Sequence, residues 1–270
     1  MDSKDTSNHL LNRDYLYLWE GMFLFIGYGI QTNVHDHHAV QIAVSLDEPF
    51  KMRINNGDWK LVTSLIIDSD QSHQCSAERS RIIFISIDPE TSLAQRLKEK
   101  YFKNISLEIP VIERVQSLID GIKICLNEPE NISKLKSVIL RFLDQITFSE
   151  SSNATIDDRI QKAISIIKNS LNKKITLKFL SENVFLSQSR LVHLFKEQTG
   201  IPVRKYILWS RLNLAAQKII NEKNFTTAAI EAGFSDLAHF SRTFTRMFGM
   251  SPSTILKNSQ NIQAYVCTLE

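Results

Sequence analysis

The sequence has few cysteines, the residues that stabilise small proteins through disulfide bonds or structural zinc sites. Its 270 residues include only three cysteines, Cys75, Cys125 and Cys267, which are odd in number, far apart and never in a C-x-x-C pair. This spacing argues against a disulfide framework and a zinc finger, and it fits a reducing compartment. The longest apolar run, Met22 to Ile30, is interrupted by two glycines and is too short for a transmembrane helix.

The sequence also lacks the signals of export and of common catalysis. Charged residues such as Asp2, Lys4 and Arg13 leave no room for the apolar core of a signal peptide. A G-x-S-x-G elbow, a phosphate-binding loop and a Rossmann glycine pattern are missing, and no Ser-His-Asp set stands out. We therefore expect a cytoplasmic protein that does not cross a membrane and is not an enzyme.

Charge divides the chain into two halves. Up to Ala154 there are 16 basic and 21 acidic residues, whereas the rest of the chain holds 16 basic and 8 acidic residues. A basic half joined to an acidic half is typical of proteins whose basic half binds nucleic acid. Charge alone leaves open a basic domain that is merely soluble, so the motifs must decide.

The region from about Tyr15 to Asp88 has the pattern of short strands. Asn, Gly and Asp turns separate these runs, and Asn56-Gly57 is the sharpest hairpin signal. The pattern predicts a small β-barrel or a two-sheet sandwich. The expected strands are Met22–Ile26, Val40–Val44, Phe50–Ile54, Leu61–Ile67 and Arg81–Ile87.

After Pro89 the apolar period changes to that of amphipathic helices. Three helices are expected, near residues 93–101, 111–127 and 131–148. They either cover the barrel or pair with a second copy of the chain, and the sequence favours neither reading. The most apolar candidates for a dimer contact are Val115, Leu118, Ile122, Val138 and Phe142.

A polar stretch at 149–154 is the expected linker to an all-helical region. Asp157 and Asp158 open a helix, in keeping with the preference for acidic residues in a first turn. Two helix pairs with apolar stripes follow between Leu177 and Pro252, and a longer helix from about Val203 to Ile220 joins them. Each pair has a serine, Ser187 or Ser235, where an N-cap is expected before its second helix.

This region resembles the DNA-binding domain of AraC-type transcriptional regulators, in which a long helix joins two helix-turn-helix units. The residues that carry the resemblance in the first unit and the joining helix are Leu191, Leu194-Phe195-Lys196, Thr199-Gly200, Tyr206, Arg211 and Ala215. Those in the second unit are Ala229, Gly233-Phe234-Ser235-Asp236, Phe240-Ser241-Arg242, Phe244, Phe248-Gly249 and Ser251-Pro252. Two positions depart from the family pattern. Phe185 stands where the first turn usually carries Gly, and Ala228 stands where Ile is usual.

The resemblance implies that the second helix of each pair carries the base-reading residues. In the first unit they are Ser189, Val192 and His193, with Gln188 and Lys196 nearer the DNA backbone. In the second unit they are Leu237, Ala238, Ser241 and Arg242, with Arg246 as a phosphate contact. Arg242 has the chemistry to bind guanine bidentately, and Val192 can contact a thymine methyl group. Because Leu237 and Ala238 form no side-chain hydrogen bonds, the second unit is expected to position the protein more than it selects sequence. The alternative for each residue is solvated surface.

Histidines cluster in the first half. His35, His37 and His38 precede an expected strand, Gln41 follows, and His73 comes later. Because alternate strand residues share a face, His35, His37 and Gln41 are expected on one side. With His73 from a facing strand they would form a set of three imidazoles and one amide oxygen, which suits a divalent metal. The pattern resembles the cupin metal motif, with Gln41 in place of Glu. Metal binding, contact with a small-molecule effector and a structural role all remain open.

Together these patterns predict an α+β protein. Residues 1–150 are expected to form a cupin-like β-barrel with helices, and residues 155–258 an all-α double helix-turn-helix domain. The predicted function is a sequence-specific regulator of transcription that binds double-stranded promoter DNA, responds to an unknown small-molecule effector and forms a homodimer. By the resemblance it is an activator, with RNA polymerase as a further partner. The only cofactor considered is a divalent metal.

Two alternatives remain for the function. The chain could be a metal-dependent cupin enzyme fused to a DNA-binding module, or an architectural DNA-binding protein without an effector. The strand-rich first half argues against the architectural protein, because such a protein needs no sensing barrel.

Overall fold

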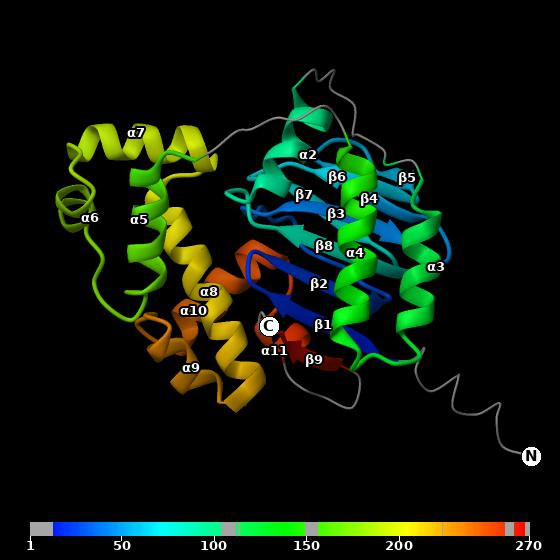
Figure 1. Ribbon diagram of the computed structural model, residues 1–270. Coiled ribbons are helices and arrows are strands. Elements are labelled where there is room, and N and C mark those ends of the chain that lie inside the picture. Colours follow the sequence, from blue (N-terminus) through cyan, green and yellow to red (C-terminus); the bar gives the residue numbers. More distant parts are fainter. Residues whose placement is uncertain are drawn as a thin grey trace, which may run out of the picture. The chain divides into compact units, whose positions relative to one another are not determined.

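The chain folds into two compact units. The computed structural model describes residues 13–103, 112, 114–148, 156–222, 224–256 and 262–267. The sheet unit combines residues 1–152 with 258–270, and the helical unit spans residues 153–257. All strands of the described residues belong to the sheet unit (Figure 1), so the α+β prediction is confirmed. The predicted linker, 149–154, lies outside the described residues.

A large sheet with strand order β6-β3-β8-β2-β1-β9 forms the main layer of the sheet unit. Its strands are β1 (Asp14–Trp19), β2 (Met22–Tyr28), β3 (Val40–Ser45), β6 (Ser64–Ile67), β8 (Arg81–Ile87) and β9 (Ile262–Val266). Neighbours pair antiparallel except β1 and β9, which are parallel. The sequence pattern did not predict β9.

A smaller sheet with order β5-β4-β7 completes the strands. Its members are β4 (Phe50–Ile54), β5 (Lys60–Val62) and β7 (His73–Ser76). The expected single strand Leu61–Ile67 is therefore wrong, because the chain changes sheets at Thr63. The hairpin between β4 and β5 is present, but its left-handed residues are Asn55 and Asn56 rather than Asn56 and Gly57.

Three helices pack against the large sheet. They are α2 (Ser92–Phe102), α3 (Gln116–Cys125) and α4 (Ile132–Thr147). The first and third follow their predicted positions closely, whereas the helix expected at 111–127 begins later, at Gln116. In Figure 1, α3 and α4 run in front of the large sheet. The side chains of Thr91 and Asn131 accept hydrogen bonds from the first turns of α2 and α4, as expected of N-caps.

The helix stripes proposed for dimer contact face inward instead. Leu118, Ile122 and Phe142 are buried in one core with the strands of the sheet unit, so their use in a dimer contact is wrong. Val115 and Val138 are partly buried against the same core. Covering the apolar side of its own sheet is the role that the structure gives this stripe.

The helical unit contains two helix pairs joined by α8 (Val203–Glu222). The first pair is α6 (Leu177–Asn183) and α7 (Gln188–Thr199), and the second is α9 (Phe225–Glu231) and α10 (Leu237–Phe248). The helices α5 (Asp158–Lys168) and α11 (Pro252–Leu256) flank them. Among the described residues, none of the helices has the length and apolar character that a membrane crossing requires.

Ring and ion-pair contacts place the two helix pairs along α8. The ring of Phe195 on α7 contacts Tyr206 near the start of α8, at 5.4 Å between centroids. Near the other end, Lys218 of α8 bonds Glu231 of α9. With its 20 residues, α8 is about 30 Å long, which is close to one turn of DNA, and it contacts the two pairs at different points along its length.

Candidate functional site

The first helix pair has the turn and cap that the sequence predicted. The hydroxyl of Ser187 accepts a hydrogen bond from Arg190 N at 3.2 Å and so caps α7. Phe185 lies in the turn with φ of +55°, and its side chain is 87% exposed. A non-glycine residue at positive φ costs about 1 kcal/mol, so the first turn holds a small strain.

The second helix pair differs at its turn and at its cap. Gly233 occupies the turn with φ of +90°. Asp236, rather than Ser235, caps α10: its carboxylate accepts a hydrogen bond from His239 N at 2.6 Å. The predicted serine cap is therefore wrong by one residue, and Ser235 donates its hydroxyl to Asp236 instead. The hydrogen bond from His239 N lowers the pKa of Asp236 and keeps the capping carboxylate ionised.

Arg211 of α8 connects the two halves of the helical unit. Its guanidinium donates to Leu171 O and to Lys173 O, each at 3.0 Å, in the segment after α5. A Cβ atom on Gly233 would lie 2.2 Å from the same Leu171 oxygen, so the second turn fits only because it lacks a side chain. The resemblance included Arg211, but no local signal gave its role in positioning the pairs.

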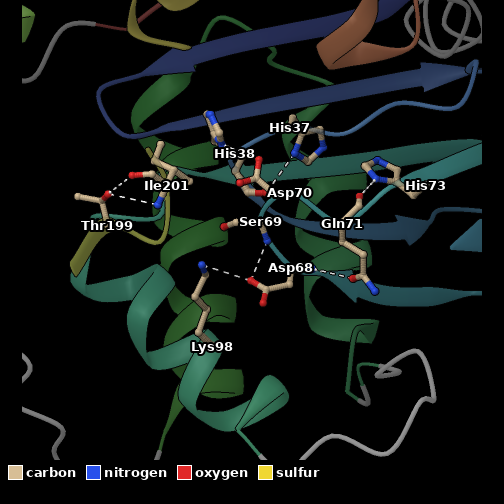
Figure 2. Close-up of polar contacts among 11 residues, drawn as sticks. His37, His38, Asp68, Ser69, Asp70, Gln71, His73, Lys98, Thr199 and Ile201 are labelled. Carbon is tan, nitrogen blue, oxygen red and sulfur yellow. Dashed lines mark hydrogen bonds and ion pairs between the residues drawn. The ribbon is translucent and has the colours of Figure 1, made fainter. Parts of the chain in front are cut away.

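Three histidines of the sheet unit converge in a buried cluster. They are His35 and His37, which both lie in the segment before β3, and His73 at the start of β7. One ring nitrogen of each lies within 4.8 Å of those of the others. Gln41 joins them from β3, with its Oε1 2.7 Å from His37 Nε2. The prediction that these residues share one place is met, and Figure 2 shows His37 and His73 within this part of the unit.

Backbone carbonyls fix the orientation of all three rings. The Nδ1 atoms of His35, His37 and His73 lie 2.8, 3.1 and 2.8 Å from the carbonyl oxygens of residues 33, 39 and 71. Because a carbonyl oxygen only accepts, the Nδ1 atoms of His35 and His73 must carry the proton, and the Nε2 atoms of these two rings hold a lone pair. The neutral ring of His37 has an oxygen acceptor at each nitrogen, Ala39 O at Nδ1 and Gln41 Oε1 at Nε2, so it donates to only one of them. The Nε2 of His73 is buried without a hydrogen-bond partner among the described residues.

Burial keeps these imidazoles neutral. Burial, and next the charge of His37, lowers the pKa of His35 to about 4. Burial also lowers the pKa of His37, and it lowers that of His73 well below the ordinary range. A cluster of neutral imidazoles with one ring nitrogen of each within 4.8 Å of the others has the chemistry of an electron-pair donor site.

His38 stands apart from this cluster. Its Nδ1 lies 2.9 Å from the carboxylate of Asp70, as Figure 2 shows. The neighbouring turn is held by Lys98 of α2, which pairs with Asp68 at 3.3 Å. Of the five residues predicted for an effector or metal site, the structure thus brings together His35, His37, Gln41 and His73, and it places His38 with Asp70.

Comparison with known proteins gives the family. A model of a helix-turn-helix domain matches residues 180–258. A protein of Photobacterium leiognathi named "Probable transcriptional regulator LumQ" is 33% identical over 230 residues, which cover 81% of this chain and 90% of the relative. The chain belongs to the AraC-type family of transcriptional regulators.

Other members of the AraC-type family match more remotely over a similar length. The transcriptional activator RhaS of Mannheimia succiniciproducens is 23% identical over 250 residues, covering 92% of this chain and 81% of the relative. The crystal structure of ToxT from Vibrio cholerae shares the fold, with a TM-score of 0.55 at 12% identity over 86% of this chain and 96% of ToxT. This AraC-type regulator is therefore a DNA-binding protein whose helical unit carries the binding function.

The outward faces of α7 and α10 present the ten residues that are predicted to contact DNA. Every one of the ten lies at least partly at the surface, and seven of them are exposed: Gln188, Ser189, His193, Lys196, Ala238, Arg242 and Arg246. Val192, Leu237 and Ser241 are half-buried. The inward residues Leu191, Phe195, Phe240 and Phe244 fill the core behind them. Contact with DNA stays a prediction for each of the ten.

Proposed function

We propose that this regulator senses an effector at the histidine cluster of the sheet unit and that binding there changes how the helical unit binds promoter DNA. The observation that carries the proposal is the set of three buried imidazoles whose Nδ1 atoms all lie within hydrogen-bond distance of backbone carbonyls. A purely structural histidine satisfies both of its ring nitrogens, whereas His73 leaves Nε2 without a partner among the described residues.

The effector class that this donor set favours is a borderline divalent cation such as Zn²⁺, Ni²⁺ or Co²⁺. Metal-bound histidines characteristically donate their other ring N–H to a carbonyl or carboxylate, and the Nδ1 atoms of all three lie next to backbone carbonyls here. Gln41 would add an amide oxygen, and Ser86 Oγ lies 3.5 Å from that oxygen. Three neutral imidazoles and one neutral amide supply no negative charge, so we expect exchangeable binding that suits sensing.

Metal binding tests this assignment directly. We expect the purified protein, stripped with a chelator, to bind one Co²⁺ per chain and to develop the visible absorption of a Co²⁺–imidazole complex. Titration calorimetry with Ni²⁺ and Zn²⁺ gives the affinity. His73→Ala should abolish the absorption because it removes one of three imidazole ligands, and Gln41→Glu should tighten binding because a carboxylate adds negative charge.

Two matched histidine variants serve as controls. His193→Ala removes an exposed imidazole of the helical unit, and His38→Ala removes the neighbour that pairs with Asp70. Both should keep the Co²⁺ absorption. Absence of Co²⁺, Ni²⁺ and Zn²⁺ binding by the folded wild-type protein would overturn the metal assignment, and a screen of organic metabolites by thermal shift would then test the other class of effector.

We further propose that the protein activates transcription as a homodimer that contacts RNA polymerase. The relative named a transcriptional activator supports activation. Exposed Ile124 of α3 and Leu140 of α4 support a contact between copies, because large apolar side chains are left at the surface beside the covered stripe. Light scattering at micromolar concentration should give twice the mass of the chain, and Leu140→Asp should return it to that of a single chain.

A further inference from the structure

Strand β9 brings the chain back to the sheet unit after the helical unit is complete. Residues 153–257 form the helical unit, and residues 258–270 belong again to the sheet unit. Five residue pairs, from Asp14 with Ile262 to Leu18 with Val266, align β9 parallel to β1 (Figure 1). A parallel pair always needs a crossover connection, and here that connection contains the whole DNA-binding unit. The helical unit is therefore joined covalently to the sheet unit at both of its ends.

Specific contacts hold β9 on β1. Cys267 N donates to Leu18 O at 2.8 Å, and the Tyr265 ring stacks on Tyr17 with 4.9 Å between centroids and 10° between planes. Tyr17 is fully buried, and its hydroxyl donates to Pro129 O at 3.0 Å, so Tyr265 covers a rigid surface. Ile262 and Cys267 are buried at the two ends of the contact.

The same strand is the most weakly buried member of its sheet. Every residue of β3 and β8 is buried, whereas the four residues 263–266 of β9 are only half-buried. β9 also lies at the edge of the sheet, with one neighbouring strand. The Tyr265 hydroxyl is buried without a hydrogen-bond partner among the described residues, and water would satisfy it if the strand left. An edge strand with little burial separates at lower free energy than the strands inside.

We propose that β9 is a reversible latch on the DNA-binding unit. When β9 is docked on β1, the helical unit is restrained at both ends; when β9 leaves, only the connection near residues 149–155 restrains it. Closing such a loop reduces the arrangements open to the helical unit, so docking and DNA binding must be coupled whenever DNA selects among those arrangements. Because such coupling is reciprocal, DNA changes the docking equilibrium of β9 by the same factor by which docking changes the affinity for DNA.

Hydrogen exchange of the full-length protein tests this coupling. The probe is a duplex that the wild-type chain selects from a pool of random sequences. We expect saturating duplex to change the exchange rates of the β9 amides by about tenfold, while the amides of β3 and β8 keep their rates. Rates for β9 that the duplex leaves unchanged would overturn the proposal.

Two proline variants give an independent test. Because Cys267 N–H points toward β1 and N–H directions alternate along a strand, the Gln263 N–H also faces β1 and the Ala264 N–H faces away. Gln263→Pro should break the pairing and change the dissociation constant for the duplex by about fivefold or more. Ala264→Pro, on the open edge, should stay within about twofold of the wild type.

The remaining outcomes separate the latch from its alternatives. The direction of the change for Gln263→Pro tells whether the docked arrangement is the one that binds DNA, and either direction supports the latch. Equal affinities for both variants and the wild type would overturn it. A two-chain mass by light scattering that Gln263→Pro alone reduces to one chain would also overturn it, because β9 of a second copy would then be the strand on β1.

Discussion

The two units carry their candidate functional residues in opposite ways. In the helical unit these residues point outward from α7 and α10, and the core behind them is mainly apolar. In the sheet unit they point inward, where His35, His37 and His73 are buried and held by backbone carbonyls. An outward set suits a macromolecular partner that brings its own surface, whereas an inward set suits a small ligand that loses its water on entry.

The largest effect is expected from a substitution in the core of the sheet unit. Phe142→Ala should lower the free energy of unfolding of that unit by about 3–5 kcal/mol, because it leaves a cavity in the core under α4. Leu140→Ala on the exposed side of the same helix is the control and should cost less than about 1 kcal/mol. Chemical denaturation followed by tryptophan fluorescence gives both values. Equal effects would mean that α4 does not cover the sheet.

In the helical unit the largest effect is expected at the second turn. Gly233→Ala should lower the stability of the helical unit by about 2–5 kcal/mol, because a positive φ and a clash with Leu171 O act together. Urea unfolding with a probe in this unit measures it. Gly57→Ala is the control, since Gly57 has no positive φ and a Cβ there would lie 3.1 Å from Ile54 O. If the Gly233→Ala protein were as stable as the Gly57→Ala protein, the second turn would not require glycine.

On the outward face, Arg242→Ala should weaken binding to the selected duplex by about 1–3 kcal/mol and relax the preference at one base pair. Arg246→Ala is the matched comparison: a phosphate contact should weaken binding to all sequences alike and reduce the salt dependence. Binding measured across single-base variants of the duplex separates the two. If the Arg242→Ala protein binds every duplex with the affinity of the wild type, Arg242 is a solvated surface residue that does not contact DNA.

The cap of the second recognition helix gives a smaller effect. Asp236→Ala should destabilise the helical unit by about 1 kcal/mol because α10 loses the acceptor for His239 N. Ser235→Ala should cost only a few tenths of a kcal/mol, since its hydroxyl donates to the cap without replacing it. Thermal melting of the two variants decides between them, and the reverse order would restore the serine as the cap.

The smallest effect is expected at the first turn. Phe185→Gly should raise stability by less than about 1 kcal/mol, because glycine relieves the positive φ but adds freedom to the unfolded chain. The loss of the contact between Lys162 and the Phe185 ring, at 5.4 Å, reduces the gain. Phe185→Ala, which keeps the strain, is the control and should be less stable than Phe185→Gly in the same melting experiment.

Local patterns predicted most of the helical unit. The apolar stripes of α7, α8 and α10 follow a helical period, so they fixed which residues face the core and which remain outside. Errors arose where several local solutions compete. Ser235 and Asp236 are both good caps, and only the path of the chain selects Asp236. The prediction of a strand at Leu61–Ile67 failed for a similar reason, because one β-branched run can supply strands to two sheets.

The sequence predicted which residues form the histidine cluster, but it did not predict which ring nitrogens carry the protons. Parity along one strand gave His35, His37 and Gln41 a common side, although the two histidines precede β3. The separation of His38, by contrast, depends on Asp70 in a distant turn. The tautomers of His35 and His73 depend on backbone carbonyls, and a carbonyl is the same atom group in every residue. Nothing in the sequence could therefore indicate them.

By itself the sequence determined the two-part α+β organisation and the outward faces of the recognition helices, because these follow from local periodicity and from charge. It indicated the family through residues that match the AraC-type pattern. Tertiary structure alone decided that the stripe on α3 and α4 covers its own sheet, that one ring nitrogen from each of three histidines lies within 4.8 Å of the others, and that β9 returns to β1. Each of these depends on contacts between segments far apart in the chain, and the free energy of such contacts comes from packing that no single segment contains.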